Sequence, residues 1–429
     1  MIEKPTLSIV FLGRVDSGKS TLAGRLLHSL GTVNDSIIER LQVESREFGF
    51  AKTHYANVLS RTREETRRGR SIHLAYSRAE TKHFHINIID APAAPFVKSM
   101  IRGISQANVG IIVLDAESGS LEQQTVKEIL LTTQSLGEFQ LIFCVNKMDS
   151  MFVANSETKF KEIQNSEMSK IYKMHGYKGD PLLIPVSAWT GDNVVDCCDM
   201  KWYKGPTLLD AINSLKIPTY LEDKPLRIPI SKVYNKRGKP IVFGKIESGI
   251  LKLDSKLRCT PNKKVPHVTI ESIEIFRERV SEAKAGQFVT IKLQNVRRSD
   301  VKSGMVLSDS RNDPAREVLC FKAEIIVLKR TAIKIGYKPT FHCHSLQTRC
   351  QFIQFYECSK MPLKTERKEN PSELRRGQVA RVLLKPDNPI SLETLQNIPK
   401  LGKFIMRDNG CVCVVGIVKD ITFVDEHIC

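Results

Sequence analysis

The stretch Gly13-Arg14-Val15-Asp16-Ser17-Gly18-Lys19-Ser20 separates two segments of different periodicity. Before it, residues 7–12 form a mainly apolar run, which is typical of a strand buried on both faces. After it, leucines recur at helical spacing between residues 22 and 30. A strand, a glycine-containing turn and a helix in this order match the phosphate-binding loop G-x-x-x-x-G-K-[ST].

Each residue type in this loop has a physical role toward a phosphate group. Glycines let backbone N–H groups approach and surround the phosphates, and the N-terminus of the following helix adds a favourable partial charge. We expect Lys19 to neutralise the β- and γ-phosphates and the Ser20 hydroxyl to bind Mg²⁺. The phosphate end of a nucleotide site is therefore assigned to Gly13, Asp16, Ser17, Gly18, Lys19, Ser20 and Thr21.

A second motif, Asn146-Lys147-Met148-Asp149, follows the apolar run 141–145 and points to the base. A carboxylate at Asp149 can accept hydrogen bonds from both N1–H and the 2-amino group of guanine. Adenine offers neither donor, so it would leave a charged acceptor unpaired. Asn146 can bond the purine edge, and Ser187-Ala188 is placed to support the base through a backbone N–H. These residues, with Lys147, predict a guanine nucleotide, GTP or GDP.

Asp90 ends the apolar run 85–89, where an acidic group can hold Mg²⁺ through water. Upstream, residues 64–72 form a charged loop with a central glycine. The Ser71 hydroxyl in this loop could close over Mg²⁺ and the γ-phosphate, but such a charge run is also typical of a solvated surface. The metal-site residues are assigned as Ser20, Ser71 and, through water, Asp90.

Strands and helices alternate from residue 6 to about residue 217. Five short apolar runs read as strands, with helical patterns between them. This alternation predicts an α/β domain with a mainly parallel sheet and helices on both faces. The predicted strands are residues 6–12, 85–89, 108–114, 139–145 and 182–186.

The pattern changes after a linker at residues 222–225. Many short strands separated by turns follow, which is the signature of small antiparallel barrels. A second break falls near residues 310–314, where Asp, Asn and Pro cluster. We predict three domains: a nucleotide-binding α/β domain at 1–222 and two all-β barrels at 223–312 and 313–429.

The charge of the chain is concentrated in the predicted barrels. The net charge is +18, and residues 223–429 hold 39 Lys and Arg against 22 Asp and Glu. A basic half joined to a neutral half indicates a footprint for a polyanion such as RNA, although a merely solvated basic surface remains open.

Apolar runs and cysteines limit the location of the protein. No apolar run approaches the length of a membrane span, so we expect no membrane partner. The 11 cysteines form no CxxC pair, which argues against zinc sites and a disulfide framework. Scattered thiols favour a reducing cytoplasm, where we expect a monomer.

In this order, these motifs resemble the translational GTPases of the elongation factor 1-alpha family. That family includes the GTPase subunit of eukaryotic release factor and a GTPase of ribosome rescue. The resemblance implies a P-loop G domain followed by two barrels, GTP-dependent cargo binding, and cargo release after hydrolysis on the ribosome, with ribosomal RNA as a partner. Further matching segments are Trp202-Tyr203-Lys204-Gly205, Asp223-Lys224-Pro225-Leu226-Arg227, Gly244-Lys245-Ile246-Glu247-Ser248-Gly249, Leu401-Gly402-Lys403-Phe404 with Arg407-Asp408, and Val415-Gly416.

The sequence departs from the family after Asp90. The family pattern there is D-A-P-G-H-x-x-F, whereas this chain reads Asp90-Ala91-Pro92-Ala93-Ala94-Pro95-Phe96, one residue shorter and without the glycine or the histidine. In relatives that histidine orients the attacking water, so its absence near Ala94 predicts slow hydrolysis. No catalytic residue is assigned, and whether the protein is an active enzyme stays open. Arg14 also replaces a family histidine, and Ser71 a threonine.

Three functions fit this pattern. A carrier of a tRNA-mimicking release or rescue factor is favoured, because Thr62-Arg63-Glu64-Glu65 resembles that branch and a low flux tolerates slow hydrolysis. An elongation factor delivering aminoacyl-tRNA is the alternative, which Cys343-His344-Ser345 supports. The third is a non-hydrolysing, GTP-clamped module that binds RNA or protein, which Ala93-Ala94-Pro95 supports.

Overall fold

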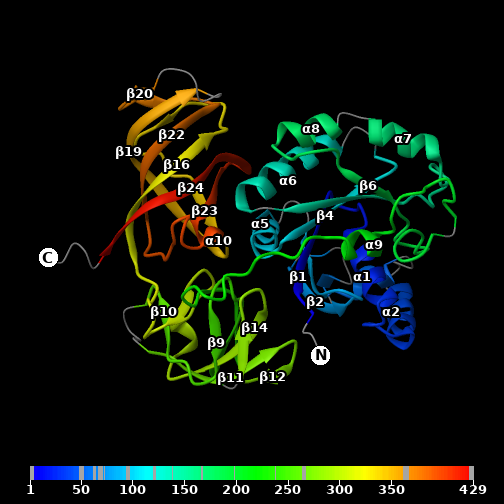
Figure 1. Ribbon diagram of the computed structural model, residues 1–429, viewed down its shortest axis with the longest axis horizontal. Coiled ribbons are helices and arrows are strands. Elements are labelled where there is room, and N and C mark those ends of the chain that lie inside the picture. The colour runs from blue at the N-terminus through cyan, green and yellow to red at the C-terminus, as the bar shows by residue number, and fades with distance from the viewer. Residues whose placement is uncertain are drawn as a thin grey trace. The chain divides into compact units, whose positions relative to one another are not determined.

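The computed structural model describes residues 4–47, 53–60, 64–65, 71, 73–92, 97–118, 122–137, 139–165, 168–197, 199–236, 238–262, 267–360 and 367–424. The chain divides into two compact units: residues 1–134 with 138–218, and residues 219–429 with 135–137 (Figure 1). No helix within the described ranges is long and apolar enough to cross a membrane.

The first unit is built on a single sheet with the strand order β2-β3-β1-β4-β5-β6. All neighbouring strands run parallel except β2, which pairs antiparallel with β3. This is the mainly parallel sheet that the sequence predicts. The strands are β1 (Thr6–Gly13), β2 (Ala75–Glu80), β3 (His85–Asp90), β4 (Val109–Asp115), β5 (Gln140–Asn146) and β6 (Leu182–Pro185).

Each of the five predicted strands is present within about a residue of its expected bounds, because each is rich in apolar residues. Every residue of β4 is buried, as expected for a strand covered on both faces. The sequence analysis missed β2, whose residues Tyr76, Ser77 and Arg78 are half-buried. An edge strand of mixed polarity carries no such apolar signal.

Helices cover both faces of the sheet, as predicted. Ile9 and Phe11 share one apolar core with Leu26 of α1 and Ile212 of α9. Val10 points the opposite way, and a Cβ at Gly103 of α5 would lie 3.4 Å from its side chain. The helices are α1 (Lys19–Ser29), α2 (Asp35–Glu47), α3 (His54–Asn57), α5 (Val97–Gln106), α6 (Glu122–Leu136), α7 (Glu157–Asn165), α8 (Met168–Met174) and α9 (Leu208–Asn213).

The start of α9 is stabilised by a capping box. Thr207 is the N-cap, and its hydroxyl accepts a hydrogen bond from the Asp210 N–H at 3.2 Å. The Asp210 carboxylate in turn accepts the Thr207 N–H at 3.4 Å. This reciprocal capping box places the start of α9 at Leu208.

The second unit contains two large antiparallel sheets with the orders β10-β15-β7-β8-β14-β11-β12 and β18-β23-β24-β16-β22-β19-β20. Two small sheets, β13-β9 and β17-β21, complete it. The first large sheet and β13-β9 use β7 (Ile228–Lys236), β8 (Lys239–Lys245), β9 (Ile250–Lys252), β10 (Leu257–Thr260), β11 (Thr269–Ile275), β12 (Glu278–Val280), β13 (Glu282–Lys284), β14 (Phe288–Gln294) and β15 (Val306–Asp309). The others use β16 (Val318–Val327), β17 (Ile333–Lys334), β18 (Thr340–Cys343), β19 (Leu346–Lys360), β20 (Lys368–Glu369), β21 (Glu373–Leu374), β22 (Gln378–Pro386), β23 (Lys403–Asp408) and β24 (Cys411–Phe423), with the short helix α10 (Pro399–Gly402).

Both large sheets close on themselves, which confirms the two barrels. In the first, Leu257 of β10 exchanges backbone hydrogen bonds with Val268, the residue before β11. In the second, β18 pairs with β19 as well as with β23. Each barrel has its own apolar core. The domain boundaries at residues 222/223 and 312/313 stay a prediction.

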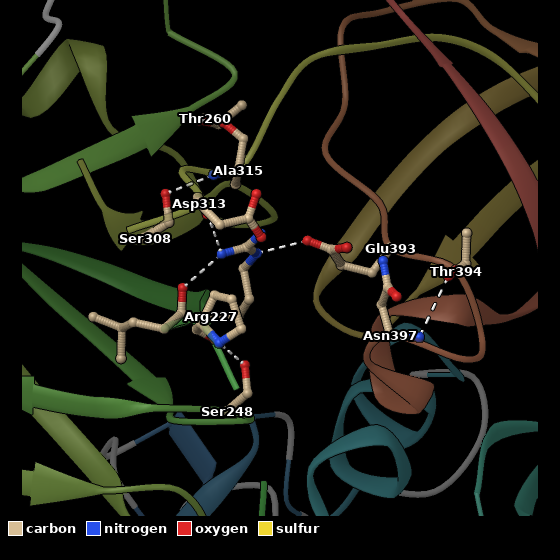
Figure 2. A network of polar contacts seen from close by, with 11 residues as sticks. Arg227, Ser248, Thr260, Ser308, Asp313, Ala315, Glu393, Thr394 and Asn397 are labelled. Atoms are coloured by element: carbon tan, nitrogen blue, oxygen red, sulfur yellow. Dashed lines mark hydrogen bonds and ion pairs between the residues drawn. The ribbon is translucent and has the colours of Figure 1, made fainter. Parts of the chain in front are cut away.

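A buried arginine joins the two barrels (Figure 2). Arg227, with 3% of its side chain exposed, precedes β7 of the first barrel. Its Nε donates to Glu393 Oε1 at 2.6 Å, and its two terminal nitrogens donate to the Asp313 carbonyl at 2.8 Å and carboxylate at 3.0 Å. One guanidinium therefore holds residues that lie 86 and 166 positions away in the chain.

Candidate nucleotide-binding site

The stretch Gly13–Ser20 connects the end of β1 to the start of α1. Gly18 is the N-cap of α1 and has φ of 89°, a left-handed conformation that favours glycine. A Cβ at this position would lie 2.2 Å from Asn146 Nδ2. The loop is therefore packed against the second predicted motif so closely that only glycine fits.

The N-terminus of α1 has the properties of an anion site. No side chain of the described residues caps it, and its first turn contains no acidic residue. Its N–H groups and partial positive charge are thus available to a phosphate. The buried Ser17 hydroxyl likewise has no hydrogen-bond partner among the described residues. Lys19, only 7% exposed, donates from Nζ to the Arg14 carbonyl at 2.5 Å and lies within the loop.

The three residues assigned to the metal meet at one point. The Ser20 hydroxyl donates to Asp90 Oδ2 at 2.6 Å and lies 2.9 Å from the Ser71 hydroxyl. Ser71 also donates to the same Asp90 oxygen at 3.3 Å. Residues from α1, from the end of β3 and from the charged loop are thereby brought together.

The second carboxylate oxygen of Asp90 shows that this cluster fits a cation. Asp90 Oδ1 is buried and has no partner among the described residues, so it is available to a water ligand of a metal. Burial raises the pKa of Asp90, while the hydrogen bond from Ser20 and the charge of Lys19 oppose that effect. A bound Mg²⁺ would favour the ionised carboxylate.

Asn146 connects the phosphate loop to the loop that follows β6. Its Nδ2 donates to the Ser17 carbonyl at 2.9 Å, and its Oδ1 accepts the Ala188 N–H at 2.9 Å. Ser187 shapes the same loop, because its N–H donates to the Asp192 carbonyl and its hydroxyl accepts the Thr190 N–H. The predicted contact of a backbone N–H from Ser187-Ala188 with the base stays a prediction.

The remaining residues of the second motif, Lys147 to Asp149, differ in their exposure to solvent. Lys147 has φ of 67°, and the two residues that follow differ in burial: Met148 is buried and Asp149 is exposed. Lys147 Nζ donates to Asp115 Oδ2 at 2.7 Å. Sequence reasoning missed Asp115, although an acidic residue directly after the predicted strand 108–114 was a usable signal. An exposed carboxylate at Asp149 is free in orientation to meet a guanine edge.

The charged loop before Ser71 is not simply a solvated surface. Glu65 is 2% exposed, and its carboxylate accepts the His73 N–H at 2.9 Å. Glu65 is therefore not part of a solvated, exposed surface. Residues 66–70 and 72, and the segment Ala93-Ala94-Pro95, lie outside the described residues, so the predictions that concern them stay predictions.

Three family models match the chain in the order in which its sheets occur. The model described as the elongation factor Tu GTP binding domain matches residues 4–217. Elongation factor Tu domain 2 matches residues 240–308, and the GTP-eEF1A C-terminal domain-like family matches residues 320–419.

Several proteins are similar to this chain over nearly its full length. Elongation factor 1-alpha of Archaeoglobus fulgidus is 38% identical over 98% of this chain and 99% of that protein. Elongation factor 1-alpha of Pyrococcus woesei is 39% identical over 97% of each chain. The solved GTPase-like domain of Saccharomyces cerevisiae Ski7, bound to GTP, has a TM-score of 0.78 at 17% identity and covers 97% of this chain and 98% of that one.

A P-loop α/β domain followed by two antiparallel barrels, with the motifs in this order, defines a translational GTPase fold. Within that class, the chain belongs to the elongation factor 1-alpha family.

Proposed function

We propose that this protein is a GTP-binding translation factor that acts at the ribosomal A site. The observation that carries the proposal is the convergence of Ser20, Ser71 and Asp90, beside a phosphate loop in which the Ser17 hydroxyl and Asp90 Oδ1 lack partners among the described residues. A nucleotide phosphate could accept a hydrogen bond from the Ser17 hydroxyl, and a water bound to a cation could donate one to Asp90 Oδ1.

We assign the guanine nucleotide to the residues of the two motifs and Mg²⁺ to Ser20, Ser71 and, through water, Asp90. When bound, Mg²⁺ neutralises charge on the β- and γ-phosphates. Within the described residues no three His, Cys, Asp or Glu side chains form a metal cluster. This agrees with a site in which hydroxyls, phosphate oxygens and water supply most ligands.

Hydrolysis is proposed to be slow. Phosphoryl transfer depends on positioning the attacking water and on stabilising charge, and this chain has Ala93-Ala94-Pro95 where the family has a water-orienting histidine. The remaining residues can bind and orient the triphosphate. Ribosome-stimulated single-turnover rates equal to those of a histidine-bearing relative would contradict this part of the proposal.

The proposed cargo is a protein that mimics tRNA, used in termination or ribosome rescue. Such a factor works at lower flux than an elongation factor and tolerates slow turnover. The basic barrels, which hold most of the net charge of +18, are proposed to contact ribosomal RNA, with the protein acting as a monomer in the cytoplasm.

Delivery of aminoacyl-tRNA is the second candidate. It is favoured by relatives that match almost the full chain, among them two elongation factors 1-alpha at 38% and 39% identity. A bulk elongation factor hydrolyses GTP in every cycle, however, and Ala94 disfavours that. A non-hydrolysing, GTP-clamped binding module is the third candidate. Purified protein that retains GTP rather than GDP would favour the module.

Affinity capture tests the proposal directly. The protein is loaded with a non-hydrolysable GTP analogue, incubated with native cytosol, and both protein and RNA in the eluate are identified. A Lys19→Ala variant, which should not bind the triphosphate, provides the matched control. A release- or rescue-factor-like protein that is captured only by the loaded wild type supports the proposal, whereas aminoacyl-tRNA in its place supports the elongation role.

A further inference from the structure

Arg25 reaches from the phosphate-binding helix to the loop at the base end of the site. It lies on α1, six residues after Lys19. Its Nε donates to the Ala188 carbonyl at 3.3 Å, and its Nη2 donates to the Trp189 carbonyl. A single guanidinium therefore holds two successive peptide groups of the loop that follows β6, and its rigid fork suits this arrangement.

Ala188 is fixed from two sides. Its N–H donates to Asn146 Oδ1, and its carbonyl accepts from Arg25. Asn146 in turn is fixed to the Ser17 carbonyl of the phosphate loop. Arg25 and Asn146 are thus two separate supports that set the position of one peptide next to the assigned base site.

The other side of the guanidinium packs on α3. The Arg25 Cζ atom lies 3.9 Å from the centre of the Tyr55 ring, which is the geometry of a cation–π contact. Tyr55 is 7% exposed. A Cβ at Gly24 would lie 1.9 Å from the Tyr55 carbonyl oxygen, so the backbones of α1 and α3 are in direct contact. Arg25 therefore has little room to move away from the loop.

Aromatic rings complete the connection between α3 and the loop. The His54 and Tyr55 rings lie 4.4 Å apart, and the His54 ring meets the Trp189 ring edge-on at 5.0 Å. Trp189 is therefore held twice, by its carbonyl on Arg25 and by its ring on His54. Arg25 contacts Trp189 directly through a hydrogen bond and indirectly through the rings of α3. A change at Arg25 should therefore move Trp189.

We propose that Arg25 is a positioning residue for guanine recognition, acting through the Ala188–Trp189 backbone, with Tyr55 and His54 holding it in place. The inference rests on the proposed binding of guanine nucleotides. It predicts that loss of the guanidinium releases the loop at the base end and leaves the phosphate end unchanged. The dissociation of GDP and of a GTP analogue should then accelerate by the same factor.

The test measures dissociation rates of fluorescent GDP and of a fluorescent, non-hydrolysable GTP analogue from wild type, Arg25→Ala and Arg25→Lys. Arg40→Ala, an exposed arginine on α2, is the matched control. Arg25→Ala should release both nucleotides about tenfold faster, since two hydrogen bonds from a charged group are lost. The dissociation rates of Arg25→Lys, whose ammonium can donate to one of the two carbonyls, should lie between those of wild type and Arg25→Ala. The rates of Arg40→Ala should stay within about twofold of wild type.

A second readout separates positioning from a general loss of structure. The chain has two tryptophans, so a Trp202→Phe background leaves Trp189 as the only one. In that background, Arg25→Ala should shift Trp189 emission to longer wavelength while the thermal midpoint measured by far-UV circular dichroism stays close to that of Arg40→Ala. Arg25→Lys applies the same test with a smaller perturbation if Arg25→Ala folds poorly.

Three outcomes would overturn the inference: Arg25 variants within about twofold of wild type, acceleration confined to the triphosphate, or unchanged Trp189 emission. Each leaves the proposed function standing, since wild type would still bind guanine nucleotides. Failure of the wild type to bind either nucleotide would instead refute the proposed function itself.

Discussion

The imidazole of His344 lies 2.9 Å from the carboxylate of Glu247, and both side chains are almost fully buried between residues of the two barrels. A neutral imidazole protonated at Nε2 can donate to Glu247 and accept at Nδ1 from the Ser345 hydroxyl, which lies 3.0 Å away. Lys245 is buried in the same group. The barrels are thus joined by a compact polar cluster in addition to Arg227.

This cluster predicts a pH dependence of stability. Burial lowers the pKa of His344, so the folded protein keeps it neutral where the unfolded chain is protonated. Below the ordinary pKa of histidine, about 6.5, the unfolded state binds the extra proton, and stability should fall as pH decreases, by at most about 1.4 kcal/mol per pH unit. Urea unfolding between pH 8 and pH 5 should show a smaller loss for His344→Gln. An identical slope would show that His344 does not titrate between these states.

Gly18→Ala should weaken nucleotide binding through one steric contact. The new Cβ would lie 2.2 Å from Asn146 Nδ2, and Asn146 would have to leave the Ser17 carbonyl. We expect GDP affinity to fall at least about tenfold in a titration. Gly31→Ala is the control, because Gly31 also has positive φ but no atom within 4 Å of its Cβ position. Equal effects of both changes would mean that backbone conformation, not the contact with Asn146, is limiting.

Asp90→Asn should weaken the binding of Mg²⁺ to the GTP-loaded protein. The amide removes the charge that the metal site needs and places a donor beside the Ser20 and Ser71 hydroxyls. Titration of Mg²⁺ against a GTP-loaded protein should show affinity for the cation lower by about 10–100-fold. Asp180→Asn, at an exposed ion pair with Lys173, is the matched surface control. A Mg²⁺ affinity unchanged by Asp90→Asn would remove Asp90 from the metal site.

Asp149→Asn should exchange the base preference from guanine to xanthine. The carboxylate is exposed, so the substitution should leave the fold unchanged. Removing the acceptor of the guanine 2-amino group should cost at least about 100-fold in GDP affinity, while xanthosine diphosphate gains. Competition binding with both nucleotides measures the switch. A retained preference for guanine would refute the assignment of the base site.

Arg227→Ala should destabilise the joint between the barrels. It leaves the carboxylate of Glu393, 13% exposed, without its guanidinium partner. Removing one member of a buried ion pair costs about 3 kcal/mol, which chemical denaturation would detect. Arg381→Ala removes an exposed arginine that pairs with Glu357 and should cost less than about 1 kcal/mol. Similar losses for both variants would contradict a special role for Arg227.

Several parts of the site could be predicted from sequence because they are local. The loop 13–20 and the motif 146–149 each follow an apolar strand, and parallel strands place their carboxyl ends at the same edge of the sheet. The sequence predicted no strand order, and the observed order β1-β4-β5 brings the two loops to the same edge. The strand β2 was missed, because its residues form no apolar run.

Contacts between distant side chains could not be predicted. Nothing in the sequence pairs Arg25 with the Ala188 and Trp189 carbonyls, and nothing marks Glu65 as buried within a charged loop. The same holds for Arg227, whose partners lie in a linker and in the second barrel. At residues 64–72, the run of charges alone left a solvated surface open as an alternative.

The class of fold, the order of the domains and the guanine-nucleotide ligand could be predicted from the sequence, because hydrophobic period and loop chemistry are encoded over short stretches. Which polar groups contact one another depends on the tertiary structure. Asn146 joins two loops, Asp90 Oδ1 is buried without a partner among the described residues, and Arg25 holds the Ala188 carbonyl. Buried polar atoms must find partners across the fold, and the fold alone determines which partners come within reach.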